Sequence, residues 1–179
     1  LSINLALEGK KVVVVSSGDP GVFAMASAIF EVVDKKSLSR DDLPILVLPG
    51  ITALLAASAR LGAPIGHDFC VINLSDNLKS WDVLKSRVIA AAKADFVIAF
   101  YNPRSKSREN QLSEIYDILR KNCDSDRLVI YANSVSTEAE AIFETTLSEA
   151  DASLVSMKTL VIIGSSSTKK IRDTGYIYT

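Results

Sequence analysis

The sequence predicts an α/β protein, because short apolar runs typical of strands alternate with apolar stripes at helical spacing. Val12–Val15 is a run of four valines, which suits a strand buried on both faces, as in mainly parallel sheets. Gly18, Pro20 and Gly21 then break the chain, and apolar residues recur at helical spacing over 22–33. The alternation continues to the C-terminus, and this repetition is the signature of α/β architecture.

Composition limits the class of function. The chain has 179 residues, of which 48% are apolar, and a formal net charge of −1 that argues against a nucleic-acid binder relying on bulk positive charge. No apolar run approaches the roughly 20 residues of a membrane span, and no signal peptide is evident. The chain has one histidine and two cysteines in unrelated contexts, which excludes most zinc sites and gives no disulfide framework. We therefore expect a cytoplasmic protein without a metal, a membrane or a nucleic-acid partner.

The first nine residues resemble the end of an amphipathic helix closed by Gly9. The chain has no initiating methionine and starts inside this helix, which predicts that an upstream part is missing. Pro49 and Gly50 break the chain after a second strand, and Asn102 with Pro103 ends a later one. The predicted strands cover 12–15, 45–48, 69–74, 96–101, 128–132, 141–146 and 159–163, and the predicted helices cover 22–33, 52–61, 81–92 and 112–119.

We predict two α/β domains that meet near Gly66–Phe69, after a helix that Gly62 and Pro64 terminate. Residues 1–67 would form a partial N-terminal domain, and residues 68–179 a complete C-terminal domain. Four strand ends carry unusual loops, at 17–20, 49–53, 101–105 and 164–167. Ligands of open α/β sheets collect at the carboxyl ends of strands, so these loops are candidate binding segments.

Two of these loops contain groups suited to a ligand. Gly18 and Gly21 have no side chain to keep a ligand from the backbone, and Asp19 offers an acceptor between them. Thr52 opens a helix, where its hydroxyl and the first N–H groups suit a carboxylate. The alternative is that the first loop is an ordinary strand-to-helix corner and the second only a helix start.

In this order, the loops resemble those of the tetrapyrrole methylases, the S-adenosylmethionine-dependent enzymes of sirohaem and cobalamin synthesis. The resemblance runs from about Leu5 to the C-terminus. Within the family, the branch that methylates precorrin-3B is the most similar. The phrases that carry the resemblance are Ser-Ser-Gly-Asp-Pro-Gly-Val-Phe-Ala-Met-Ala at 16–26, Leu-Gly-Ala-Pro-Ile-Gly-His-Asp-Phe-Cys at 61–70, Leu-Ser-Asp at 74–76 and Tyr-Asn-Pro-Arg-Ser at 101–105.

The resemblance implies a homodimer of subunits with two α/β domains each, and S-adenosylmethionine bound in the cleft between the domains. It implies methylation of precorrin-3B, or its cobalt counterpart, with ring contraction to precorrin-4 and release of S-adenosyl-L-homocysteine. Alternative acceptors are uroporphyrinogen, another precorrin, a diphthine precursor or ribosomal RNA; a further alternative is a non-catalytic ligand-binding fragment. The cofactor residues implied are Ser17, Gly18, Asp19, Val22, Thr52, Ala53, Asn102, Asn133, Ser134 and Thr159.

The tetrapyrrole substrate carries many carboxylates, which arginine binds with two parallel hydrogen bonds. Arg104, Lys106 and Arg108 are therefore candidates for binding these carboxylates, with a solvated loop as the alternative. Tyr101 is a further candidate substrate residue, which would pack against a face of the ring. His67 and Asp68 are the candidate acid or base for ring contraction, although a lone histidine is often structural. The family begins with a strand and a G-x-G-P-G loop that helps to form the cleft and that this sequence lacks, so the resemblance predicts weaker cofactor binding by this chain.

Overall fold

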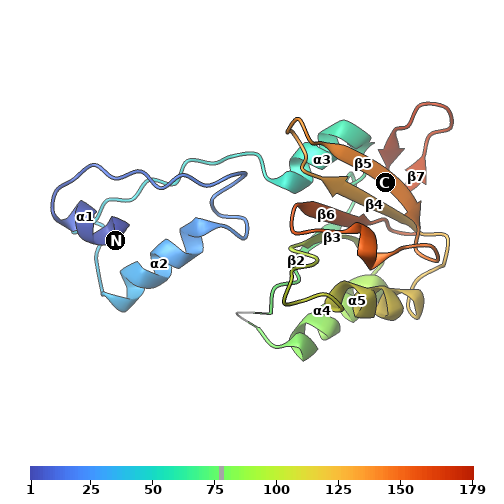
Figure 1. Ribbon diagram of the computed structural model, residues 1–179, viewed down its shortest axis with the longest axis horizontal. Coiled ribbons are helices and arrows are strands. Elements are labelled where there is room, and N and C mark those ends of the chain that lie inside the picture. The colour runs from blue at the N-terminus through green and yellow to red at the C-terminus, as the bar shows by residue number, and fades with distance from the viewer. Residues whose placement is uncertain (77–78) are drawn as a thin grey trace. The chain divides into compact units, whose positions relative to one another are not determined.

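The computed structural model describes residues 1–76 and 79–179, which form two compact units, 1–52 and 53–179 (Figure 1). The predicted boundary near residues 66–69 thus falls inside the second unit. The reason is that helix α3 (Ala53–Leu61) contributes Leu54, Ala57 and Leu61 to a core that the later strands complete. In the described residues, no helix is long and apolar enough to span a membrane.

The first unit contains helices α1 (Ser2–Leu7) and α2 (Met25–Lys35). Gly9 closes α1 as predicted: it has φ of 81°, and its N–H donates to the Ala6 carbonyl at 2.9 Å. Helix α2 begins three residues later than predicted, because Phe23 has a φ of 52° that no right-handed helix accommodates.

The prediction of strands at Val12–Val15 and Ile45–Leu48 is wrong for the described structure, where both segments are irregular (Figure 1). A strand needs a neighbour for its backbone groups, and neither segment belongs to a sheet ladder. Their side chains are correspondingly exposed: Val13 is 84% exposed, and Leu46 is 81% exposed.

The second unit is built on a five-stranded sheet in the order β2-β3-β6-β4-β5. Strands β2 and β3 pair in parallel, and all other neighbours are antiparallel, so the sheet is mixed rather than mainly parallel. Its strands lie close to the predicted ranges: β2 (Phe69–Asn73), β3 (Val97–Tyr101), β4 (Leu128–Asn133), β5 (Ala141–Thr146) and β6 (Thr159–Ile163).

Helices α4 (Trp81–Lys93) and α5 (Gln111–Arg120) cover one face of this sheet (Figure 1). Alternate strand residues such as Phe100 point into that core, whereas Ala99 and Ile130 face α3. Burial on both faces explains why β3, β4 and β6 are nearly all apolar. A short 3-10 helix, η1 (Ala152–Leu154), precedes β6. A small second sheet joins β1 (Gly62–Ala63), β7 (Lys169–Lys170) and β8 (Ile177–Tyr178) in the order β1-β8-β7.

Candidate functional site

The Asp19 carboxylate joins the two candidate loops of the first unit. Its Oδ1 accepts the Gly21 N–H at 2.7 Å, and its Oδ2 accepts the Gly50 N–H at 3.0 Å. The hydrogen bonds from Gly50 and Gly21 lower the pKa of Asp19 below its usual value, so the carboxylate is ionised at neutral pH. Each carboxylate oxygen can accept a second hydrogen bond, so these contacts leave acceptor capacity for a ligand hydroxyl or ammonium group.

Gly50 lies in a candidate loop but was not among the predicted site residues. A Cβ on Gly50 would lie 2.1 Å from the Gly18 carbonyl oxygen, a distance that forces the backbone to move. Gly18 itself has φ of 69°, and a Cβ there would lie 3.7 Å from the Thr52 Cα. The structure therefore brings Gly18, Asp19 and Thr52 together, with Ser17 and Val22 on either side along the chain. The Pro-Gly pair at 49–50 is the sequence signal for this close approach.

A second group of candidates lies at one edge of the large sheet, in the second unit. Strands β2 and β3 end there, at Asn73 and Tyr101, which are register partners. Strand β4 also ends at this edge, where Asn133 pairs with Thr159 at the start of the antiparallel β6. The predicted residues Tyr101, Asn102, Asn133, Ser134 and Thr159 are thus brought to one edge.

Side-chain amides link neighbouring strand ends along this edge. The Asn102 Nδ2 donates to Asn73 Oδ1 at 3.0 Å, and the same oxygen accepts the Ser75 N–H at 2.9 Å. The buried Thr159 hydroxyl donates to Asn133 Oδ1 at 3.2 Å. Asn73 was not predicted as a site residue, and the available signal was a polar residue near the end of a predicted strand. The edge therefore presents ordered amide and hydroxyl groups, which suit a ligand with hydroxyl and amino groups.

Two strands at this edge are each followed by a non-glycine residue whose backbone lies in the left-handed region. Asn102 follows β3 with φ of 51°, and Ser134 follows β4 with φ of 48°. Such backbone is uncommon outside glycine and persists where its surroundings hold it. The Ser134 carbonyl accepts the Thr137 hydroxyl at 2.8 Å, and its N–H donates to the Lys158 carbonyl at 2.9 Å.

Tyr101 ties the first turn of α3 to the end of β3. The Leu54 N–H donates to the Tyr101 hydroxyl oxygen at 2.9 Å, so this helix-start donor is already engaged. Ala53, predicted from the resemblance to bind the cofactor, precedes Leu54 in the same turn.

The three predicted substrate cations have different surroundings. Arg104 Nη1 donates to the carbonyls of Ala152 and Ser153 at 3.4 and 3.3 Å, and Arg108 donates to two other carbonyls. Lys106 is exposed between them. The arginines therefore order the loop, whereas the expectation was a set of three cations aimed at carboxylates.

His67 and Asp68 lie apart from this edge. Both precede β2, at the opposite end of its five residues from Asn73, and a strand of that length spans roughly 16 Å. Both are exposed. The structure does not bring them together with the amide and hydroxyl groups described above.

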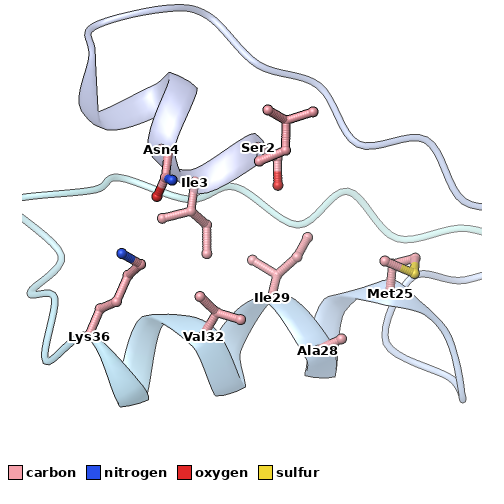
Figure 2. A pocket seen from close by; sticks show the side chains of 9 residues that line it. Ser2, Ile3, Asn4, Met25, Ala28, Ile29, Val32 and Lys36 are labelled. Carbon is pink, nitrogen blue, oxygen red and sulfur yellow. The ribbon is translucent and has the colours of Figure 1, made fainter.

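A pocket of about 400 Å³ lies between α1 and α2 in the first unit (Figure 2). Apolar side chains line most of it, and Lys36 closes one end. None of the predicted site residues lines it. Its residues are Leu1, Ser2, Ile3, Asn4, Met25, Ala28, Ile29, Val32 and Lys36.

The family model of the Tetrapyrrole (Corrin/Porphyrin) Methylases matches residues 1–151. The chain belongs to this family. A Precorrin-3B C(17)-methyltransferase from Sinorhizobium sp is 46% identical over 175 residues, which are 98% of this chain and 69% of the relative. A probable cobalt-factor III C(17)-methyltransferase from Salmonella typhimurium is 42% identical over 93% of this chain and 68% of the relative. These relatives confirm the predicted branch: the chain is a methyltransferase of the cobalamin-biosynthesis C(17) type.

Solved methylase structures agree with the mixed α/β fold. The crystal structure of the methyltransferase CobJ is 48% identical, with a TM-score of 0.93 over 99% of this chain and 73% of that one. A uroporphyrin-III C-methyl transferase from Thermus thermophilus, complexed with S-adenyl homocysteine, has a TM-score of 0.64 at 20% identity over 90% of this methylase and 69% of that chain. The latter likeness concerns the fold alone.

Proposed function

We propose that this methylase transfers a methyl group from S-adenosylmethionine to C17 of precorrin-3B, or of its cobalt-containing counterpart, with ring contraction to precorrin-4. The observation that carries the proposal is the 46% identity to the Sinorhizobium methyltransferase, which extends over 98% of this chain. The loops at 16–26 and 101–105, which carry the resemblance to that branch, are held by hydrogen bonds of Asp19 to Gly21 and Gly50 and of Asn102 to Asn73.

The residues present fit this cofactor. Asp19 is an ionised acceptor between two loops that glycine backbone brings close together, and a carboxylate acceptor suits ribose hydroxyls or an ammonium group. Asn102, Asn133 and Thr159 offer amide and hydroxyl groups at the sheet edge. We assign cofactor binding to these residues together with Ser17, Gly18, Val22, Thr52, Ala53 and Ser134.

The sequence offers few side chains for nucleophilic or metal catalysis, with one histidine and two cysteines, and this agrees with such a reaction. When bound, S-adenosylmethionine supplies a methyl group that is already activated by its sulfonium. The protein then has to align two reactants, and alignment can lower a barrier by up to roughly 7–11 kcal/mol. The macrocycle carbon provides the nucleophile, so no nucleophilic side chain is required.

We assign substrate carboxylates to Lys106 and Arg104, and contact with the macrocycle to the Tyr101 ring. Lys106 is exposed, and Arg104 is half-buried with only Nη1 bonded to carbonyls among the described contacts. His67 or Asp68 as the acid or base of ring contraction has weaker support, because both precede β2 and lie at its other end. The homodimer, the ligand cleft and the domain limits of 1–67 and 68–179 stay predictions.

Two measurements test the proposed function. Calorimetric titration with S-adenosylhomocysteine is expected to show binding at one site per chain. Incubation with S-adenosylmethionine and precorrin-3B, or cobalt-factor III, is expected to give a product heavier by one methyl group in the mass spectrum. Binding without methyl transfer to either tetrapyrrole would favour the alternative of a different acceptor, and no binding would overturn the proposal.

A further inference from the structure

Arg108 connects the loops that follow the two parallel strands of the sheet. Its Nη1 donates to the Leu74 carbonyl at 3.1 Å and to the Asn102 carbonyl at 3.2 Å. Leu74 follows β2, and Asn102 follows β3. The Arg108 side chain is only 12% exposed. It is therefore surrounded by protein, and its position does not resemble that of a solvated cation.

The remaining atoms of this guanidinium are also oriented. Its Nε lies 4.0 Å from Asp76 Oδ1, and the other oxygen of Asp76 accepts Gln111 Nε2 at 2.9 Å. Its Nη2 lies 3.9 Å from the Met157 sulfur, on the turn that precedes β6. Arg108 thus has neighbours from the loops next to β2, β3 and β6.

The residue whose carbonyl Arg108 holds is the left-handed Asn102. This conformation is uncommon for a residue with a side chain, and Pro103 restricts the preceding residue further. Two interactions hold Asn102 in place: its side-chain amide donates to Asn73, and its carbonyl accepts from Arg108. Strain of this kind persists only when several contacts determine it.

We propose that Arg108 is a positioning residue for ligand binding: it bridges the Leu74 and Asn102 carbonyls and so fixes the direction of the Asn102 side chain. It does not contact the tetrapyrrole carboxylates, which leaves that role to Lys106 and Arg104. The inference rests on the proposed function for its ligand, but the loop order that it describes is measurable without any ligand.

The first test is hydrogen exchange of the protein without ligand. The Leu74 N–H donates to the Tyr101 carbonyl at 2.9 Å, and the Ser75 N–H donates to Asn73, so both amides report on the order of these loops. In Arg108→Lys we expect both amides to exchange at least about tenfold faster, because one ammonium does not reproduce the bridge. Exchange of these amides at the wild-type rate would overturn the proposal.

The matched control is Arg120→Lys. Arg120 also bridges two carbonyls, those of Leu147 and Ala150 at 3.1 and 2.7 Å, and it lies on α5 outside the candidate edge. We expect this variant to lower the unfolding midpoint as Arg108→Lys does, while Leu74 and Ser75 exchange at the wild-type rate. Equal acceleration in both variants would mean general loosening and would overturn the positioning role.

The second test separates positioning from direct substrate contact. In Arg108→Lys we expect the Kd of S-adenosylhomocysteine and the KM of the methyl donor to rise about tenfold, with an unchanged KM and salt dependence for the tetrapyrrole. The reverse pattern, with only the tetrapyrrole KM raised, would make Arg108 a substrate ligand and overturn the proposal. If the wild-type protein does not bind S-adenosylhomocysteine, the proposed function fails, and the exchange experiment still decides the positioning role.

Discussion

Asp95 and Arg127 form an ion pair of 2.8 Å at the sheet edge opposite the candidate site. Arg127 is only 8% exposed, and its Nε and Nη1 are buried without a partner among the described residues. Asp95 also accepts hydrogen bonds from the backbone and the hydroxyl of Ser166, which follows β6. This pair therefore connects the chain before β3, before β4 and after β6.

Asp95→Asn should destabilise the fold, because it leaves the buried Arg127 charge without its counter-ion. The Asp95 side chain is 43% exposed, so we expect a loss of about 1–3 kcal/mol rather than the 3–5 typical of fully buried pairs. Urea unfolding measures the loss, with Asp126→Asn as an exposed control one residue from Arg127. A midpoint equal to that of the control would contradict the prediction.

The same pair predicts a pH dependence. Desolvation opposes ionisation of Asp95, but the Ser166 hydrogen bonds and Arg127 outweigh it and lower its pKa below the ordinary value. A lowered folded-state pKa gives stability that is present above the unfolded pKa of about 3.9 and is lost as pH falls towards the folded value. The difference in unfolding free energy between wild type and Asp95→Asn should therefore shrink below pH 4.

Asp19→Ala should weaken S-adenosylhomocysteine binding about tenfold, because two loop N–H groups lose their acceptor and the loop pair loses its shape. The Asp19 side chain connects loops that are 31 residues apart, so local order is expected to fall as well. Calorimetry measures the affinity, and Asp34→Ala on α2 is the matched control. If Asp19→Ala bound S-adenosylhomocysteine with wild-type affinity, Asp19 would not belong to the cofactor site.

Gly50→Ala tests the same loop pair by crowding. Its Cβ would meet the Gly18 carbonyl at 2.1 Å, and backbone cannot yield as a flexible side chain does. We expect S-adenosylhomocysteine affinity to fall by about tenfold or more, at the level of 1–3 kcal/mol that overpacking costs. Leu46→Ala, at a position 81% exposed, should bind normally. Equal S-adenosylhomocysteine affinity in both variants would show that binding does not require the close approach of Gly50 to Gly18, and would contradict the prediction.

Lys106→Ala should raise the KM of the tetrapyrrole several-fold and leave S-adenosylhomocysteine binding unchanged, because the exposed ammonium is assigned to a substrate carboxylate. Arg104→Ala should act in the same direction, and Arg104→Lys should recover only part of the loss. Salt should weaken tetrapyrrole binding to the wild type more than to Lys106→Ala. Normal turnover in both alanine variants would make this segment a solvated loop.

The second unit could be predicted from sequence because each of its large-sheet strands has apolar residues on both faces. Val97 to Phe100 and Leu160 to Ile163 are buried throughout, and the structure ends these strands within a residue of the predicted limits. Val12–Val15 has the same composition but forms no strand. Apolar composition reports a preference for burial, whereas a strand also requires a hydrogen-bonding neighbour, which composition does not supply.

The site was predicted in part. Asn102, Asn133 and Thr159 do gather at one sheet edge, since the positions follow from where strands end. The role of Arg108 was not foreseen, because a basic residue in a polar loop looks the same in sequence whether it faces solvent or donates to two carbonyls. For Asn73 and Gly50 the sequence shows only a strand end and a chain break, because the partners that give them a role, Asn102 and Gly18, are about 30 residues away.

The position of β6 in the sheet has a consequence for synthesis on the ribosome. Strand β6 lies between β3 and β4, although it is the last of the five to be made. Before residue 163 emerges, the nascent chain can form a β2–α4–β3 unit and a β4–β5 hairpin, but no strand pairs with both. Each exposes an apolar strand edge until β6 inserts and pairs with both. The late arrival of one central strand thus makes the completion of this sheet a single closing event that waits for residues 159–163.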